Sequence, residues 1–578
     1  MHTYYNDFFE RGQQIINFNL YKIGLPSHDA VFTLKKVMEE MNFSNLTSRY
    51  SKFGRRGYNP IMIFAVIIYA NLRGVKAIDR IVELCERDVC FMWLTKGEKP
   101  QRDVFYDFIN NKLTEEVLDD LHYQFIRKLK KDGLISLEAL FIDGTKIEAN
   151  ANRYTFVWRG SINYHLAGLL DKIDEAFKSY NELITKNGYD EKYSLSYAEM
   201  FIIEGMDKVK EVILKNRERK INNKKKISNN RIIEIDNISP FKLLDLQDKL
   251  LKIMYGETIL FKTGKGQKKS EIQKLYEEID SLGERLLKYK NSFEIMNSGR
   301  NSYSKTDLES TFMRMKDDHM RNGQLKPAYN VQVAVENYFV IHGYVSSDRT
   351  DYAPLIPVLE KHNKNLGYFP DEVTADSGYS SEKNLLYLSE RNIESYIKLQ
   401  THEKMKTRAY KNDIGKYYNM KKEHDFYICH DGRKLTLERT EVSKSKGFER
   451  KINVYLSKDC STCTYKSDCL YKYNEIKDKE KNKTMKVNER WDFLKEESHK
   501  NIQSEKGILN RQIRSIQTEG CFGDMKENNN FRRFNYRSSK KVYKELMLYM
   551  FGKNIGKYHK FIYGEIQKFE GKADQISA

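Results

Sequence analysis

The sequence predicts a mixed α/β protein, and three features of the chain support that class. Residues 1–135 are typical of a series of short helices, and a buried β-strand follows at 137–148. After a long helical insertion, two alternating strands within 329–345 predict a hairpin, and helices and strands then alternate as far as residue 399. This order predicts a three-strand meander followed by alternating α/β units.

The helical region 1–135 is interpreted as a DNA-binding domain. Asn59-Pro60 places a proline at the first position of a helix, and 61–72 is apolar almost all round, as in a core helix. Short helices joined by basic loops are compatible with a helix-turn-helix-like bundle on DNA, although a helical domain without DNA contacts has the same pattern. Further helices are predicted at 78–87, 89–94 and 102–110, and the basic loop residues are Lys52, Arg55, Arg56, Arg73 and Lys76.

Two carboxylates end buried strands. Asp143 interrupts the apolar run of the strand 137–148 and is followed by Gly144. A carboxylate in such a place is costly unless a metal ion or a polar partner binds it, although Asp-Gly also favours a simple turn. Asp376 ends the next predicted strand, 372–375, in the same way and is again followed by small residues.

A third carboxylate lies on a helix near the C-terminus. Glu519 is the acidic member of a mostly basic helix within 504–528, and Lys526 lies seven residues on, along the same face. Two strand-end aspartates and a helix glutamate offer the oxygen ligands that hard divalent cations prefer. Two such ions, Mg²⁺ or Mn²⁺, can activate an attacking oxygen and stabilise a leaving oxygen in phosphoryl transfer.

These motifs resemble those of DDE transposases, which bacterial insertion sequences encode. The resemblance covers most of residues 1–560 and implies an RNase H-like catalytic core in which Asp143, Asp376 and Glu519 bind the metal ions. The family often has an arginine at a fixed step before the glutamate, but Ser515 holds that step here and Arg514 is one residue off. The matching tracts are 54–60, 91–94, 141–145, 323–332, 374–379 and 516–526.

The resemblance also implies roles and boundaries. Lys526 joins the catalytic set, and Arg514, Lys326, Arg532 and Arg533 are expected to bind DNA. The core is expected to consist of 136–160, 311–400 and 501–560, with a last amphipathic helix from 541 to about 557.

Two insertions are expected to interrupt this core. In 161–310, apolar residues recur at alternating steps of three and four, which predicts two long helices packed as a hairpin. The polar, basic and aromatic tract 149–159 suits DNA contacts, or a packed connector, and the basic tract 215–231 suits phosphates, or a solvated loop. The second insertion, 401–500, is basic and predicted to be irregular.

The seven cysteines form two groups. Cys85, Cys90 and Cys521 lie in helical patterns and are interpreted as small buried apolar residues. The others would complete a tetrahedral structural zinc site as four thiolates, with reduced, metal-free cysteines as the alternative. His319 is interpreted as a surface hydrogen-bond partner of neighbouring carboxylates. The second group comprises Cys429, Cys460, Cys463 and Cys469.

Charge and composition restrict the kinds of partner and the cellular location expected for the protein. Lysine and arginine exceed aspartate and glutamate by 100 − 81 = 19, which favours a polyanionic partner, although a general lysine bias would give the same excess. The first residues lack the features of a signal peptide, the longest apolar run is too short to span a bilayer, and the odd cysteine count argues against a secreted disulfide framework. A cytoplasmic bacterial protein, associated with the nucleoid when active, is expected.

The combined expectation is a transposase that binds the double-stranded ends of its insertion sequence as a homodimer. It would cleave them in a metal-dependent reaction and transfer the 3′-OH into target DNA. Two alternatives remain open: a nuclease of the same fold that cuts without joining, and a catalytically silent DNA-binding protein.

Overall fold

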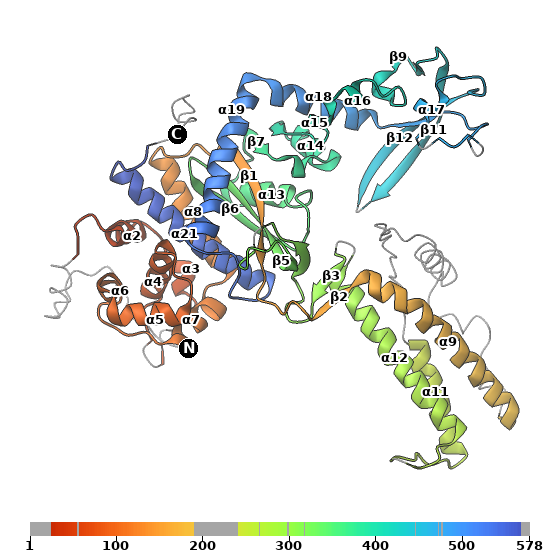
Figure 1. Cartoon of the computed structure of the whole chain (residues 1–578). Helices are drawn as coiled ribbons and strands as arrows, with labels where there is room; N and C mark the ends of the chain where they lie inside the picture. The colour runs from red at the N-terminus through yellow and green to blue at the C-terminus, as the bar shows by residue number, and fades with distance from the viewer. Residues whose placement is uncertain are drawn as a thin grey trace. The chain divides into compact units, whose positions relative to one another are not determined.

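The computed structural model describes residues 25–189 and 241–567, apart from positions 52, 55, 56, 265, 298, 299, 317, 446, 472, 476 and 477. The chain forms two compact units, shown in Figure 1. Unit 1 consists of 1–149, 315–324 and 329–578, and unit 2 of 150–314 and 325–328. The basic residues Lys52, Arg55 and Arg56 and the tract 215–231 lie outside the described residues.

A central sheet organises unit 1. Its strands follow the order β6-β5-β1-β7-β8, so the first of them in sequence lies in the middle. β5 and β6 pair antiparallel, whereas β7 pairs parallel with both β1 and β8. This arrangement confirms the mixed α/β class, including the hairpin followed by alternation, and it is consistent with an RNase H-like core. The bounds are β1 Ala139–Glu148, β5 Leu325–Glu336, β6 Phe339–Ser346, β7 Glu372–Ala375 and β8 Glu394–Ile397.

The N-terminal helices share one hydrophobic core with this sheet. The helix α4 is buried almost all round, as predicted, and Asn59 caps its N-terminus. It packs against α21, where a Cβ on Gly552 would lie only 2.7 Å from the backbone nitrogen of Leu72, so only glycine allows this approach. The helices are α2 Ala30–Glu39, α3 Ser44–Thr47, α4 Pro60–Leu72, α5 Ile78–Arg87, α6 Val89–Leu94, α7 Arg102–Asp107, the π-helix Phe108–Lys112 and α8 Glu115–Lys131.

The C-terminal helices differ from expectation at one point. The last helix, α21, spans Ser539–Ile562 and was predicted to be amphipathic, but its residues 546–551 are all buried. It is an internal helix, because α4 and α8 pack against it and β6 also contacts it. The preceding segments are α13 Leu355–Leu366, α14 Glu382–Ser389, α18 Glu489–Gln503, α19 Glu505–Arg514, the π-helix Ser515–Glu519, α20 Gly520–Gly523 and the π-helix Asp524–Asn528.

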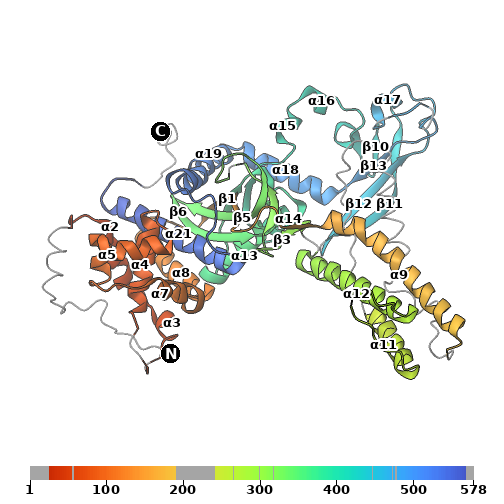
Figure 2. The same cartoon turned by 60° about the horizontal axis from the view of Figure 1, so that its bottom comes forward.

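Unit 2 contains the predicted long helices. The apolar positions of α9 Arg159–Asn187 and α12 Glu271–Met296 lie in one shared core, and a further helix, α11 Phe241–Gly256, also packs against α12 (Figure 2). Two short ladders complete the unit. β2 Phe156–Trp158 pairs with β3 Ser302–Ser304, and β4 Thr311–Arg314 pairs with the first residues of β5.

The segment 401–500 was expected to be irregular, and this expectation was wrong. It contains a five-stranded antiparallel sheet in the order β13-β12-β11-β10-β9. Its strands carry many charged residues around a small core that includes Leu435, Tyr455 and Met485, so they lack the apolar runs that reveal a strand. The strands are β9 Lys421–Glu423, β10 Phe426–Ile428, β11 Lys434–Ser445, β12 Phe448–Ser457 and β13 Thr484–Val487, and the short helices are α15 His402–Met405, α16 Arg408–Lys411 and α17 Lys466–Cys469.

Within the described part of the chain, no helix combines the length and the apolar character needed to cross a membrane.

Candidate active site

Asp143 and Asp376 meet because their strands are parallel neighbours. Ile142 of β1 lies opposite Ala375 of β7, so the residue that follows each of them is placed at the same position along the sheet. Each aspartate accepts a hydrogen bond on Oδ1 from the backbone N–H of the next residue, at 2.8 Å from Gly144 and 2.6 Å from Ser377. Burial raises the pKa of Asp143, and the negative charge of Asp376 raises it further. The two carboxylates are therefore close enough to influence each other electrostatically.

Asp143 also has a cationic partner. Burial is the main cause of its raised pKa, and the charge of Arg514 acts in the opposite direction. Arg514 Nη1 lies 2.7 Å from Asp143 Oδ2, and both side chains are largely buried. The Thr518 hydroxyl donates to the same oxygen at 3.2 Å. These contacts hold the end of α19 against β1 and favour the ionised form of Asp143.

The local helix geometry accounts for the position of Arg514, one residue away from the family's usual step. In a regular α-helix, a residue five positions on lies about 140° around the axis. Between Arg514 and Glu519, however, the chain forms a π-helix over Ser515–Glu519. Hydrogen bonds from i to i+5 widen this turn, so Glu519 lies at a smaller angle from Arg514 than it would in a regular α-helix. The carboxylates of Asp143, Asp376 and Glu519 nevertheless do not all lie within 4.8 Å of one another in this structure. Glu519 itself is exposed and directly follows Thr518.

A third aspartate at this place was missed by sequence reasoning. A Cβ added to Gly144 would lie 2.8 Å from Asp351 Oδ1, and one added to Gly378 would lie 3.0 Å from Asp351 Oδ2. Asp351 therefore sits between Gly144, within β1, and the turn that follows Asp376. The signal available in the sequence was a glycine one residue after Asp143 and two residues after Asp376, since close approach by another group is a common reason for glycine.

A network of amides holds Asp351 in place. Its Oδ1 accepts hydrogen bonds from Asn330 Nδ2 at 2.8 Å and from Gln332 Nε2 at 2.9 Å, both on β5. The Tyr379 hydroxyl donates to Gln332 Oε1. Burial raises the pKa of Tyr379 well above its usual value, and the negative charges of Asp351, Asp143 and Asp376 raise it further. Tyr379 is consequently a neutral hydrogen-bond donor beside three carboxylates.

The four predicted zinc ligands also come together. Cys469 interacts electrostatically with Cys429, Cys460 and Cys463, and burial together with these neighbours raises the pKa of its thiol. The Cys460 sulfur accepts a hydrogen bond from the backbone N–H of Lys483 at 3.5 Å. Each of the seven cysteines is a free thiol. The four thiols, the donor set of a structural zinc site, thus lie in one region at one end of the five-stranded sheet, but no three of their sulfur atoms lie within 4.8 Å of one another.

One further group could hold a cation. The described residues contain one group of three histidine, cysteine, aspartate or glutamate side chains whose ligand atoms all lie within 4.8 Å of one another. This group consists of Glu148, Asp318 and His319. His319 Nδ1 forms an ion pair with the Glu148 carboxylate. The interpretation of His319 as a hydrogen-bond partner of a carboxylate is therefore confirmed, and Glu148, at the end of β1, is that carboxylate.

Two family models match the chain. A model described as a transposase domain (DUF772) matches residues 21–111, and one described as a transposase DDE domain matches residues 428–559. No curated protein and no solved structure matches. Together the two family matches indicate a DDE-type insertion-sequence transposase.

The two matches cover different parts of this transposase. The DDE-domain match includes all four clustered cysteines and the helices with Arg514, Glu519 and Lys526, and it begins after Asp143 and Asp376. The other match covers the helices α2 to α7, for which DNA contacts were expected. The two family matches therefore agree with the resemblance, whereas the individual site residues depend on the geometry described above.

The remaining predicted residues of the transposase differ in accessibility. Lys526 is half-buried in the π-helix Asp524–Asn528. Lys326 and Arg532 are only 3% and 2% exposed, and Arg532 donates to Glu527, so neither presents its charge at the surface in this conformation. Arg533 is exposed.

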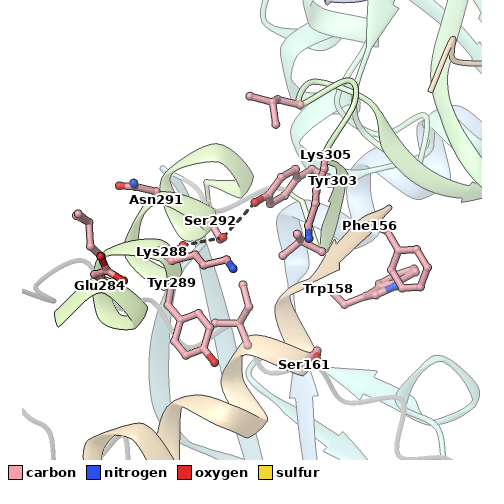
Figure 3. Close-up of a pocket in the computed structure, with 14 residues that line it drawn as sticks. Phe156, Trp158, Ser161, Glu284, Lys288, Tyr289, Asn291, Ser292, Tyr303 and Lys305 are labelled. Atoms are coloured by element: carbon pink, nitrogen blue, oxygen red, sulfur yellow. Dashed lines mark hydrogen bonds between the residues drawn. The ribbon is translucent and has the colours of Figure 1, made fainter. Parts of the chain in front are cut away.

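Unit 2 has an aromatic recess beside the tract 149–159. Figure 3 shows Phe156 and Trp158 from β2 on one side of it, with Tyr289 from α12 and Tyr303 from β3 also in its lining. The recess has a volume of about 650 Å³, and Lys288 and Lys305 also line it. It presents aromatic rings and cations together.

Proposed function

We propose that this protein binds the double-stranded ends of its own insertion sequence, cleaves them and transfers the resulting 3′-OH into target DNA. The observation that carries the proposal is the placement of Asp143, within β1, beside Asp376, which follows the neighbouring parallel strand β7, with the Arg514 helix held against Asp143. The membership in a DDE-type family supports the same reaction class.

The proposed metal ligands are Asp143, Asp376 and Glu519. Their donor chemistry fits the divalent ions that the family implies, because all the ligand atoms are carboxylate oxygens, which suit Mg²⁺ or Mn²⁺. The interaction of Asp376 with Asp143 is that of two acidic groups which a bound cation would stabilise. Two metal ions, when bound at such a site, activate the attacking oxygen and stabilise the leaving oxygen.

The protein's own side chains orient this site and keep it charged. Arg514 and Thr518 favour the ionised form of Asp143 and align the helix that carries Glu519. Asp351 lies against Gly144 of β1 and against Gly378 in the turn after Asp376, and so limits the positions that these two segments can adopt. Lys526 and the exposed Arg533 are proposed to hold DNA phosphates, which side chains of this type commonly bind.

The four clustered cysteines are proposed to hold one structural zinc ion. The five-stranded sheet has a small apolar core, which a metal would reinforce. Their electrostatic interaction with Cys469 supports the assignment, because it places all four thiols in one region of the segment, from which a zinc ion would draw them together. Zinc would also lower the thiol pKa values that burial raises.

DNA is the proposed partner of both units. The basic excess of the chain favours a polyanion, and the aromatic recess of unit 2 suits stacking with bases. A homodimer on DNA is proposed because two element ends must be joined in one reaction.

The decisive experiment incubates the purified protein with Mg²⁺, a labelled fragment carrying the element's own end, and a supercoiled target plasmid. Joined product is expected for the wild type and not for Asp143→Asn or Glu519→Ala. The matched control is Asp371→Asn, because Asp371 is exposed and precedes the opposite end of the same strand, β7. Cleavage without joining would instead identify a nuclease, and binding without either reaction a silent DNA-binding protein.

A further inference from the structure

The middle of the five-stranded sheet extends as a two-stranded ribbon. β10 pairs only with 434–436 of β11, and β13 pairs only with 453–456 of β12. Between those ladders, Thr440 to Ser445 pair only with Phe448 to Asn453 among the described residues (Figure 1). Six residues of β11 span about 20 Å at the usual rise of a strand. An isolated two-stranded ribbon is only marginally stable, so contacts made by its faces are needed to hold it in place.

One face of the ribbon is bound to the rest of unit 1. Residues directly opposite each other in an antiparallel pair lie on the same face, which puts Arg450 on one face with Ser443, its partner. Arg450 Nε lies 3.1 Å from Glu382 Oε2, and the Glu382 side chain is only 3% exposed. The same face carries Val454, which is fully buried. This face therefore serves the fold.

Glu382 is a fixed anchor for the ribbon. Besides Arg450 it accepts hydrogen bonds from Arg490 Nη2 at 2.8 Å and from Asn488 Nδ2 at 2.9 Å, both at the start of α18. Arg490 also donates to the Glu449 carbonyl of β12 at 2.7 Å. Glu382 begins α14, the helix that directly follows the turn after Asp376. The ribbon is thus tied to the segment that carries Asp376.

The opposite face carries exposed side chains along the ribbon, and nearer the centre of the sheet it continues to Tyr455, which is buried in the small core. The cross-strand pairs on it are Thr440 with Asn453, Val442 with Lys451, and Lys444 with Glu449. Val442 is 54% exposed, and the side chain of Lys444 is 75% exposed. The Thr440 hydroxyl donates to Asn453 Oδ1 at 3.0 Å, which leaves the amide group of Asn453 oriented on this face. The row exposed along the ribbon thus combines polar, apolar and charged side chains, and within it Lys444 Nζ forms an ion pair with Glu449 Oε2 at 3.2 Å.

The chemistry of that row matches the edges of DNA bases. In the major groove, asparagine pairs with adenine, lysine with guanine, threonine with either, and an apolar group contacts the thymine methyl. The major groove of B-DNA also admits a two-stranded β-ribbon. Within the ribbon, three cations, Lys444, Arg450 and Lys451, face two carboxylates, Glu441 and Glu449, and this small basic excess is in line with a polyanionic partner.

We propose that the ribbon face formed by Thr440, Val442, Lys444, Lys451 and Asn453 reads base pairs in the major groove of the DNA that this protein cleaves. The proposal rests on the proposed function, because it assigns a sequence-reading element to the same substrate. Through Glu382, DNA bound by the ribbon is held at a set position relative to the segment of Asp376.

The test selects bound duplexes from a randomised 20-base-pair pool with the full-length protein and then measures affinities for the selected sequence and its single-base-pair variants. Asn453→Ala is expected to lose roughly 5- to 150-fold of discrimination at one position. Lys451→Ala is expected to weaken binding. If Lys451 contacts a phosphate instead of a base, this variant should reduce the slope of log binding constant against log salt concentration by about one for every DNA sequence. The matched controls are Asn412→Ala and Lys458→Ala, exposed residues of the same segment outside the ribbon.

Each outcome separates the two proposals. An unchanged selected motif and unchanged affinity in both Asn453→Ala and Lys451→Ala, with wild-type melting temperatures, would overturn the ribbon proposal while cleavage and joining stand. Uniformly weaker binding without loss of discrimination would overturn base reading and leave the ribbon with a phosphate-binding role only. Failure of the wild type to select any duplex would overturn the proposed function itself.

Discussion

At the scale of single residues, opposing electrostatic effects act on the pKa of the Asp143 carboxyl group. Burial and Asp376 raise the pKa of its carboxyl group, while Arg514, the Gly144 N–H and Thr518 lower it. A group in this position must be ionised to bind a metal ion, and a carboxyl group with a raised pKa loses that charge as the pH falls. The Arg514 contact therefore decides how far toward low pH the site remains charged.

Replacing Arg514 should shift the acid limb of the cleavage profile. Arg514→Gln removes the cation 2.7 Å from Asp143, so the pKa of Asp143 should rise further and cleavage should fall at a higher pH than in the wild type. The expected result is a larger loss at pH 6 than at pH 8, measured as initial cleavage rates across that range. Arg511→Gln removes the same charge from the same helix, and an equal shift in this control would contradict a direct effect on Asp143.

At the scale of elements, the five-stranded sheet depends on a small core and on its cysteines. The buried residues of that core are Tyr427, Leu435, Tyr455, Met485 and Val487. A small module of this kind usually needs a metal or a disulfide to supplement its core, and all its cysteines are free thiols. The cysteine cluster is accordingly expected to contribute to the stability of the sheet that carries the ribbon.

Removing one clustered cysteine should remove the metal. Wild-type protein is expected to contain about one zinc ion per chain, and Cys460→Ser none, because three thiolates and a hydroxyl bind zinc poorly. Elemental analysis of the purified proteins measures this, and limited proteolysis within 401–500 reports the loss of structure. Cys521→Ala, outside the cluster, should keep its zinc; a zinc-free wild type, or one zinc in Cys460→Ser, would refute the site.

At the scale of the whole molecule, buried histidines join the N-terminal helices to the sheet. His122 Nε2 bonds the Ile341 carbonyl at 3.0 Å, and the Tyr123 hydroxyl bonds His342 Nδ1 at 2.6 Å. His342 Nε2 lies 2.7 Å from His362 Nδ1, on α13. Burial lowers the pKa of His122 and of His362 to about 4, and the positive charges of Lys361 and Lys130 respectively act in the same direction.

This cluster should make unit 1 sensitive to acid. In the unfolded chain these histidines have a pKa of about 6.5, so the unfolded state binds more protons than the folded state between pH 6.5 and pH 4. Stability is therefore complete above about pH 6.5 and decreases as the pH falls toward 4, by roughly 2 kcal/mol per histidine at pH 5. Melting temperatures between pH 5 and pH 7.5 measure the effect.

A pair of variants isolates the contribution of the cluster. His362→Gln removes one titrating group and should reduce the dependence of the melting temperature on pH. The exposed His424 should not contribute, so His424→Gln should keep the wild-type dependence. Identical pH dependence in all three proteins would show that the buried histidines do not control acid stability.

The sequence predicted much of the core and part of the site. Asp143 and Asp376 could be singled out because an apolar run followed by an acidic and a small residue is a local signal, but only Asp376 ends its strand, since β1 continues through Asp143 to Glu148. Asp351 could not, because it lies in a turn whose sequence has no periodicity, and only packing brings it to Gly144 and Gly378. The strands of the cysteine segment were also missed, since their charged residues hide the alternation that predicts a strand.

By itself, the sequence determined which segments are helices and strands of the core, which helix is buried all round, and which residue types can bind metal ions. Those properties follow from periodicity over a few residues and from the chemistry of each side chain. Only the tertiary structure decided that Arg514, 371 residues away along the chain, is the partner of Asp143. The tertiary structure alone also decided which face of the ribbon is exposed, and this is the face proposed to contact DNA. Contacts of this kind depend on how distant segments pack, and a local pattern carries no information about its remote neighbours.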